Sequence, residues 1–320
     1  MKKINVLSCF DGMSCGQIAL ERIGIPVNKY YASEIDKYAI KVTQHHYPDT
    51  IQLGSIENWK EWIDEIETPN LLIGGSPCQG FSNAGLGLNF EDPRSRLFFI
   101  FVDIRDYLLK KNPNLMWLLE NVKMKKSWER IITEMVGVEP ILIDSALVSA
   151  QSGKRLYWAN FPIFQPKDRQ IYLKDIIETG EVDREKSYAI DANYYKGGNP
   201  RLYFEDGRRQ LAFEHHTGQY IVGMTEDIKG KDQWRRIYSP DGKSPTLVGS
   251  SGGHHKPKIC LDTIHYRKLT PTECERLQTV EDNWTSMVSN TQRYKMLGNG
   301  WTIDVIAHIF SCLKLLSASP

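Results

Sequence analysis

A cysteine at the end of a short apolar run is the residue of this sequence that could carry covalent chemistry. Residues 70–73 predict a buried strand, and the Gly-Gly-Ser-Pro-Cys sequence that follows ends this strand and places Cys78 on a turn. A strand end at the carboxyl edge of an α/β sheet suits a nucleophile, because the backbone is rigid on one side and open on the other. The alternative is a small buried cysteine without a chemical role, and the residues predicted to lie near Cys78 must distinguish these two interpretations.

A carboxylic acid and a basic residue are predicted to reach the same edge of the sheet. Residues 115–119 predict a buried strand that ends in Glu120, and a later strand at 155–159 begins with Arg155. A thiolate that adds to carbon-6 of a pyrimidine, while a neutral acid protonates nitrogen-3, enables carbon-5 to attack a methyl group. We therefore expect Glu120 to lie in a desolvated pocket that raises its pKa, with Arg155 holding the acid or the base oxygen.

A nucleoside site is predicted near the start of the chain. Residues 2–9 predict the first strand, and Phe10-Asp11-Gly12 predicts a glycine turn that opens a helix. Glu34 stands at the end of the second predicted strand, about twenty positions later, where an acid can accept both hydroxyls of a ribose. A capping or surface acid is the alternative interpretation of Glu34.

Composition limits the class of protein. The chain has 320 residues, of which 41% are hydrophobic and 25% charged, as in a globular protein with one large and one smaller domain. It has no apolar run of spanning length and no signal-peptide pattern, so we expect a cytoplasmic protein. The six cysteines lack zinc-ligand spacing, which predicts reduced thiols and no metal site. The net charge is +1, but residues 196–258 carry eleven Lys and Arg against seven Asp and Glu, which weakly favours a phosphate-bearing partner there.

Strands and helices alternate from the N-terminus to Phe164, which predicts a doubly wound α/β sheet. After Phe164, glycine and aromatic residues recur without a helical period. Regular structure returns with a helix that begins at Thr270-Pro271 and with a terminal helix from Ile303 to Leu316. We expect a catalytic domain at residues 1–164 plus 240–320, and a smaller, mostly irregular or β domain at 165–239.

The sequence resembles the DNA cytosine carbon-5 methyltransferases, with six motifs in the family's order over nearly the whole chain. The motifs are Phe10-Asp11-Gly12, Ser33-Glu34, residues 75–82, Glu120-Asn121-Val122, residues 151–155 and Leu297-Gly298-Asn299-Gly300. Several motifs also resemble the animal de novo subgroup and its phage and bacterial relatives. Six ordered motifs are a specific signal.

The resemblance implies a Rossmann-like fold that uses S-adenosylmethionine (SAM), together with a target recognition domain that acts on a cytosine flipped out of double-stranded DNA. It implies that Cys78 is the nucleophile, that Glu120 is the acid and that Arg155 contacts the target base. The implied cofactor-binding residues are Phe10, Asp11, Gly12, Glu34, Ile35, Ser55, Ile56, Pro77, Asn299 and Trp301. The candidate DNA-binding residues are Gln79, Ser82, Lys154, Tyr195, Arg201, Arg208 and Arg209.

Two positions depart from the family pattern. Ser55 stands where the family usually has an aspartate that bonds the adenine amino group. Gly153 stands at the first of two arginine positions, which removes a phosphate or base contact. We expect activity to survive in reduced form, with Lys154 compensating in part.

Two other functions stay open at this stage. A catalytically weakened DNA-binding paralogue is favoured slightly by Gly153, and a transfer-RNA cytosine methyltransferase would share the catalytic motifs. The segment between Phe164 and Ser239 is longer than a minimal tRNA-type enzyme needs, so DNA is the preferred substrate. A restriction endonuclease is a candidate partner, a monomer is the expected state, and the sequence does not name the target site.

Overall fold

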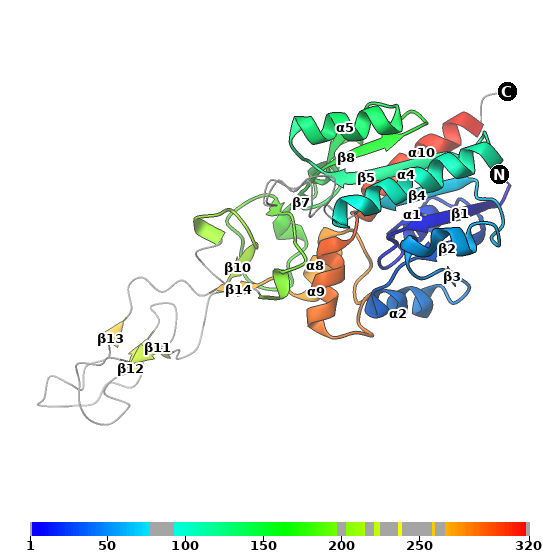
Figure 1. Ribbon diagram of the computed structural model, residues 1–320. Helices are drawn as coiled ribbons and strands as arrows, with labels where there is room; N and C mark the ends of the chain where they lie inside the picture. Colours follow the sequence, from blue (N-terminus) through cyan, green and yellow to red (C-terminus); the bar gives the residue numbers. More distant parts are fainter. Residues whose placement is uncertain are drawn as a thin grey trace, which may run out of the picture.

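A seven-stranded sheet forms the centre of the protein (Figure 1). The computed structural model describes residues 2–76, 93–196, 203–214, 221–224, 236–238, 258–259 and 266–317, with side chains for 2–76, 96–196, 203–214 and 266–313. The strand order is β3-β2-β1-β4-β5-β8-β6, and every strand is parallel to its neighbours except β8, which is antiparallel to both β5 and β6. The strands are β1 (Ile4–Cys9), β2 (Val27–Ser33), β3 (Ile51–Gln52), β4 (Leu71–Gly75), β5 (Met116–Val122), β6 (Ile141–Asp144) and β8 (Lys154–Ala159).

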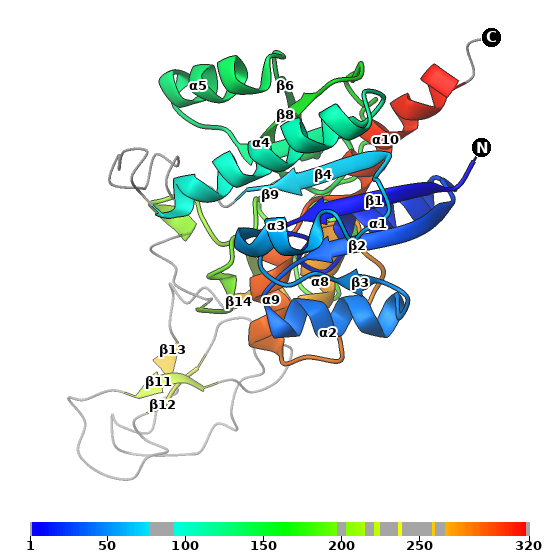
Figure 2. The same cartoon turned by 45° about the vertical axis from the view of Figure 1, so that its right-hand side comes forward.

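Helices cover both faces of this sheet, so the catalytic part has three layers (Figure 2). One face packs against α1 (Cys15–Arg22), α2 (Lys37–His46) and α10 (Ile303–Ser317), and the helices α8 (Pro271–Leu277) and α9 (Asn290–Asn299) join the same core. The other face packs against α3 (Trp59–Trp62), α4 (Pro93–Lys111) and α5 (Lys126–Val136). The predicted doubly wound α/β fold is confirmed.

Successive side chains of a strand point to opposite faces of the sheet, so the position along the strand determines the face on which each side chain lies. On β5, Leu118 belongs to the core under α1 and α10, and Leu119 belongs to the core under α4. Glu120 therefore shares the face of Leu118. On β8, Tyr157 lies on that same face, paired with Glu120 in the ladder.

The amphipathic pattern from Glu57 to about Glu67 predicts a helix, which is shorter in the structure. A 3₁₀ turn, η1 (Ile56–Asn58), leads into α3, which ends at Trp62. The chain then turns away, and the backbone N–H of Glu67 donates to the Tyr31 hydroxyl at 3.1 Å instead of to a helical carbonyl. Pro69 lies just beyond and has no N–H to extend a helix.

Smaller sheets lie outside the central one (Figure 1). β7 pairs with β9, β10 pairs with β14, and β11, β12 and β13 form a three-stranded sheet. Among the helices of the described ranges, none combines the length and apolarity that crossing a membrane requires. The strands are β7 (Gln151–Ser152), β9 (Ser187–Tyr188), β10 (Leu211–Phe213), β11 (Ile221–Met224), β12 (Arg236–Tyr238), β13 (Lys258–Ile259) and β14 (Tyr266–Lys268).

The first part of the predicted smaller domain packs onto the catalytic core. Leu173, Ile190 and Tyr194 belong to the same buried cluster as α10. The Lys186 ammonium donates to the carbonyl of Ala146 at 2.7 Å and to further backbone carbonyls nearby. The domain boundary at residue 164 stays a prediction.

Gly298 of α9 marks the closest approach between the cofactor motif and this docked segment. A Cβ at this position would lie 2.2 Å from the carbonyl carbon of Asp191 and 2.4 Å from the nitrogen of Ala192. The carboxylate of Asp191 in turn pairs with Arg208 at 2.9 Å. Only glycine lets helix α9 lie directly on this backbone.

We expect Gly298→Ala to lower the free energy of unfolding. Alanine would gain about 1 kcal/mol of helix propensity, but forcing a methyl group into backbone typically costs about 1–3 kcal/mol. The cost of overpacking should exceed the gain in helix propensity, because the contacted atoms belong to the backbone and cannot rotate away. Urea unfolding measures the difference.

Gly153→Ala is the matched control for this test. Its Cβ would lie 3.0 Å from the Ser145 hydroxyl, which is a side-chain group that can shift slightly. The Ala189 methyl at 3.7 Å would be an ordinary van der Waals contact. Equal stability of the Gly298→Ala variant and the parent would contradict the close approach.

Candidate active site

The carboxyl ends of β1, β2, β4 and β5 meet at one edge of the sheet, and Glu120 and Arg155 lie there. Gly75, the last residue of β4, is the ladder partner of Glu120 on β5. Ser76 follows Gly75, and the chain then enters the stretch that carries Cys78. Pro77, Cys78, Gln79 and Ser82 lie outside the described residues, so their predicted roles stay predictions.

Glu120 is a buried carboxylic acid with a different partner for each oxygen. Its residue is 8% exposed. Arg155 Nε lies 3.3 Å from Oε1, and the indole N–H of Trp301 donates to Oε2 at 2.8 Å. Burial raises the pKa of Glu120, although the charge of Arg155 and the hydrogen bond from Trp301 lower it. The expected desolvated acid and its contact with Arg155 are both present.

Asn121 ties the strand of Glu120 to the strand that leads towards Cys78 in the sequence. Its side-chain amide donates to the Ser76 hydroxyl at 3.1 Å and to the Ser76 carbonyl at 3.4 Å, and the residue is 1% exposed. This contact fixes the direction in which the chain leaves β4. Asn121 was not among the predicted site residues, although the Glu-Asn-Val motif contains it.

The nucleoside turn and its acid are bonded to each other. The N–H of Gly12 donates to Glu34 Oε2 at 2.7 Å, and Oε1 accepts from the N–H groups of Ile35 and Asp36, both at 2.8 Å. A carboxylate has about four lone-pair sites, so Glu34 keeps capacity for a further hydroxyl. Gly12 has a φ of +60°, which glycine tolerates and which brings its N–H towards Glu34.

The residues around this turn fit a nucleoside cofactor. Ile35 is 76% exposed and offers an aliphatic surface beside Glu34, while Ile56 is buried beneath the edge. Ser55 caps the 3₁₀ turn by accepting from the N–H of Glu57 at 3.2 Å, so its hydroxyl proton stays available to a ligand acceptor. Phe10 and Asn299 lie at the ends of β1 and α9 that approach this edge.

Asp11 is a second buried acid at the same turn. Its carboxylate accepts from the Tyr30 hydroxyl at 2.9 Å and from the Ser14 hydroxyl. Burial raises the pKa of Asp11 to about 6, and these hydrogen bonds oppose the rise. A fraction of the Asp11 carboxyl groups is therefore protonated near neutral pH.

Two buried glutamines join two motifs and the end of α8 into one network, which the sequence did not reveal. The amide of Gln151 donates to Gln278 Oε1 at 2.8 Å and to the Thr302 hydroxyl at 3.2 Å. The amide of Gln278 donates to the carbonyls of Leu297 at 2.7 Å and Gly300 at 3.2 Å. The segment before Arg155 and the segment around Trp301 are thus held together. The local signals were the motif that begins at Gln151 and the glutamine, Gln278, that directly follows α8.

The two basic residues after Gly153 point to different faces of the sheet. Arg155 lies on the face of Glu120, whereas Lys154 lies on the face of Leu156 and Trp158. This alternation disfavours the expectation that Lys154 replaces a contact made beside Arg155. The Gly153 N–H donates to the Asp144 carboxylate at 3.0 Å.

The predicted DNA-binding residues of the smaller domain do not reach Glu120. Tyr195 packs beside α9, and its carbonyl accepts from Lys268 at 3.2 Å. Arg208 is paired with Asp191, and the Nε atom of the half-buried Arg209 has no hydrogen-bond partner within the described structure. Arg201 lies outside the described residues.

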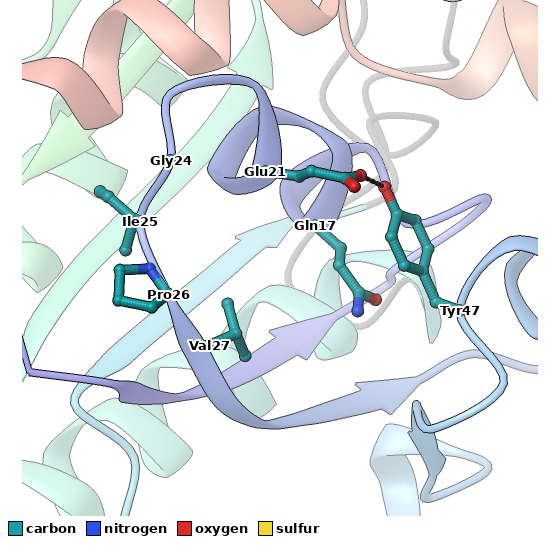
Figure 3. A pocket seen from close by; sticks show the side chains of 7 residues that line it. All are labelled: Gln17, Glu21, Gly24, Ile25, Pro26, Val27 and Tyr47. Atoms are coloured by element: carbon teal, nitrogen blue, oxygen red, sulfur yellow. Dashed lines mark hydrogen bonds between the residues drawn. The ribbon is translucent and has the colours of Figure 1, made fainter.

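A pocket of about 410 Å³ lies at the other end of the sheet, beside the start of β2 (Figure 3). The Tyr47 hydroxyl donates to the Glu21 carboxylate across it. The amino end of β2 is opposite the edge that carries Glu120, so this pocket is separate from the candidate active site. It is lined by Gln17, Glu21, Gly24, Ile25, Pro26, Val27 and Tyr47.

The mostly parallel sheet with one antiparallel strand and helices on both faces matches a Rossmann-like methyltransferase fold. The chain belongs to the C-5 cytosine-specific DNA methylase family, whose model matches residues 4–135 and 150–314. The resemblance inferred from the motifs is therefore confirmed.

Individual proteins agree with this assignment. The orphan methyltransferase M.Rho11sI of Bacillus phage rho11s is 28% identical, over 82% of this chain and 70% of that protein. The type II methyltransferase M.NlaX of Neisseria lactamica is 27% identical, over 97% of this chain and 96% of that protein. The Entamoeba histolytica methyltransferase EhMeth matches in structure with a TM-score of 0.65 at 15% identity, covering 100% of both chains. Spodoptera frugiperda DNMT2 matches with a TM-score of 0.59 at 16% identity, covering 98% of this chain and 100% of that one.

We expect the pKa of Asp11 to be visible in the stability of the protein without cofactor. The value of about 6 exceeds the ordinary value of about 3.9 in an unfolded chain, so the folded state binds more protons between these values. Stability therefore falls as pH rises through this window, by about 3 kcal/mol. The Asp11→Asn variant lacks this loss, and urea unfolding of both proteins from pH 4 to 7 measures it.

Asp282→Asn is the control, because the pairing with Arg276 lowers the pKa of Asp282. The Asp282 carboxylate adds stability as pH rises, so Asp282→Asn should change the pH dependence of stability slightly and in the direction opposite to that of Asp11→Asn. A constant difference between the parent and the Asp11→Asn variant over this range would contradict the raised pKa of Asp11.

Proposed function

We propose that the protein is a SAM-dependent DNA cytosine-5 methyltransferase. The observation that carries this proposal is the buried carboxyl of Glu120, placed between Arg155 and Trp301 and one strand away from the segment that leads to Cys78. Membership of the cytosine-specific family supports it, as do relatives that are named methyltransferases.

In the proposed reaction, the Cys78 thiolate adds to carbon-6 of the target cytosine while Glu120 gives its proton to nitrogen-3. The ring becomes an enamine, and its carbon-5 attacks the methyl group that SAM supplies when bound. A base then removes the hydrogen from carbon-5. The bond between sulfur and carbon-6 breaks, and the proton on nitrogen-3 returns to Glu120.

Burial gives Glu120 the property that this reaction needs. An acid in water would be ionised at neutral pH and could not donate a proton to the base. Desolvation favours the neutral form, and a neutral carboxyl can donate. Arg155 is placed to move from the acid to the base oxygen when a cytosine enters.

The cofactor would be held at the turn after β1. Glu34 is placed to accept ribose hydroxyls, Ile35 to support the adenine ring, and the Asn299–Trp301 segment to close the site from α9. The complete proposed set is Phe10, Asp11, Gly12, Glu34, Ile35, Ser55, Ile56, Pro77, Asn299 and Trp301.

Double-stranded DNA is the proposed substrate. A duplex hides the reacting atoms of cytosine in the base stack, so the base must be flipped towards Cys78. Residues 165–239 would form the recognition domain, with Gln79, Ser82 and Lys154 near the target. A monomer suffices for a short site, and a restriction endonuclease remains a candidate partner.

Transfer RNA is the second candidate substrate. The structural likeness to DNMT2 keeps this alternative in view, although at 16% identity it concerns the fold alone. Residues 165–239 favour DNA, because a tRNA-type enzyme needs a shorter segment there. A weakened DNA-binding paralogue is disfavoured, because Glu120 and Arg155 keep their contact.

We expect methyl transfer from labelled SAM to unmethylated genomic DNA, and much less to tRNA. Cys78→Ser should abolish transfer, and Glu120→Gln should slow it by about a thousandfold, the usual contribution of a general acid. Sequencing of the modified cytosines would identify the target site. Transfer to tRNA without transfer to DNA would reverse the order of substrates.

Glu129→Gln is the matched control for Glu120→Gln. Glu129 pairs with Lys126 on α5, away from the sheet edge, so its variant should methylate like the parent. No cysteine-dependent transfer to either polymer would contradict the proposed function.

We expect Gly153→Arg to increase the affinity for DNA and the rate of methylation at low substrate by about tenfold, as a charge-assisted contact would. The substitution requires the Ser145 hydroxyl to shift by a few tenths of an ångström, because this hydroxyl would lie 3.0 Å from a new Cβ. If the new arginine binds a phosphate, the salt dependence of DNA binding should steepen by about 0.9 in slope.

Gly153→Gln tests the same position without the charge and should leave the salt slope unchanged. A Gly153→Arg variant that binds and methylates no better than the parent would show that the missing arginine does not limit this protein.

A further inference from the structure

Trp301 contacts the acid as well as the predicted cofactor site. Its indole N–H donates to Glu120 Oε2 at 2.8 Å, across 181 positions of sequence. An indole nitrogen can only donate a hydrogen bond. Oε2 must therefore act as the acceptor in this contact.

The two oxygens of Glu120 consequently differ. Oε1 faces Arg155 Nε at 3.3 Å, and Oε2 faces Trp301. The terminal torsion of a glutamate side chain is broad, so a carboxyl without fixed partners could present either oxygen. In a neutral carboxyl, the carbonyl oxygen is the better acceptor, so an indole donor at Oε2 favours the proton on Oε1 once Arg155, which also can only donate, has moved away from that oxygen.

Trp301 is itself rigidly placed. The hydroxyl of its neighbour Thr302 donates to Gln278 Oε1 at 2.8 Å, and the carbonyl of its other neighbour, Gly300, accepts from Gln278 at 3.2 Å. Gly75 leaves room for the contact, because a Cβ there would lie 2.7 Å from Glu120 Oε2 and 2.8 Å from Trp301 Nε1. Residues of three separate segments therefore direct the indole N–H of Trp301 towards Glu120 Oε2.

We propose that Trp301 is a positioning residue for the catalytic acid: it holds Oε2 as the acceptor and leaves Oε1 as the oxygen that delivers the proton to nitrogen-3 of the target base. The inference rests on the proposed function. Arg155 lies beside Oε1 and would move to the base oxygen, so the proton-bearing oxygen is also the one that a bound cytosine uncovers.

The charge environment determines the sign of the expected pH effect. Among the described residues, Glu120 is faced by Arg155 and Tyr157 from β8 and by Cys15 from α1. Burial raises the pKa of the Tyr157 hydroxyl and the Cys15 thiol, which keeps both neutral. A hydrogen bond from Trp301 stabilises the ionised form of Glu120, so its loss raises the pKa of the acid.

The test is Trp301→Phe, measured by single-turnover methyl transfer at saturating SAM and DNA from pH 6 to 10. We expect a rate at the plateau about tenfold lower, because the proton is no longer directed to Oε1. We also expect the alkaline limb of the profile to move to higher pH, since the acid stays protonated longer. Calorimetry of SAM binding separates this effect from a loss of cofactor affinity.

Trp62→Phe is the matched control. Trp62 of α3 is buried on the other face of the sheet, and its indole nitrogen has no hydrogen-bond partner in the described structure. Its variant loses the same ring atoms without losing a hydrogen bond, so its alkaline limb should coincide with that of the parent. Gly75→Ala separates Trp301 from Glu120 by a second route and should shift the limb in the same direction as Trp301→Phe.

A Trp301→Phe or Gly75→Ala enzyme with an unmoved alkaline limb would overturn the inference, even if its rate were lower. A parent protein without cysteine-dependent methyl transfer would instead overturn the proposed function. The two failures are therefore distinguishable in one set of measurements.

Discussion

The burial of one carboxyl group, Glu120, is the constraint on which the active edge of this protein depends. An ionised carboxylate out of water is costly unless charges and hydrogen bonds compensate it. Here the compensation comes from segments far apart in the chain: Arg155 at the start of β8, and Trp301 between α9 and α10. The antiparallel insertion of β8 between β5 and β6 brings the arginine beside the acid. The result is an acid that is neither free to ionise as in water nor locked in an ion pair.

Satisfied polar groups behind this site hold it in one arrangement. Gln151 donates a hydrogen bond to Gln278, and Gln278 donates to two backbone carbonyls of the segment that carries Trp301. Buried amides are tolerated only when most of their donors and acceptors are paired, and such pairing specifies one geometry. The network therefore links the segment that leads into the strand of Arg155 with the segment that carries Trp301.

The same cofactor segment also supports the predicted recognition domain. Gly298 lies against the backbone of residues 191 and 192, and Asp191 pairs with Arg208. A side chain in the wrong place on α9 would consequently disturb both the cofactor site and the docked segment. Close packing of backbone on backbone transmits small displacements, because such contacts have no rotamers through which to relax. This arrangement explains the first glycine of the short Leu-Gly-Asn-Gly motif.

The sequence by itself determined the alternating strands and helices, the turn at Phe10-Asp11-Gly12, the acid at the end of β5 and the family. These features depend on local periodicity and on glycine and proline breaks, which are readable along the chain. It did not reveal the early end of α3, which a hydrogen bond between Tyr31 and Glu67 accompanies. Only the tertiary structure decided that Trp301 donates to Glu120, that two glutamines join two distant motifs, and that Lys154 and Arg155 lie on opposite faces of the sheet. Contacts across 181 positions depend on strand register and on how helices pack, and no local pattern encodes either.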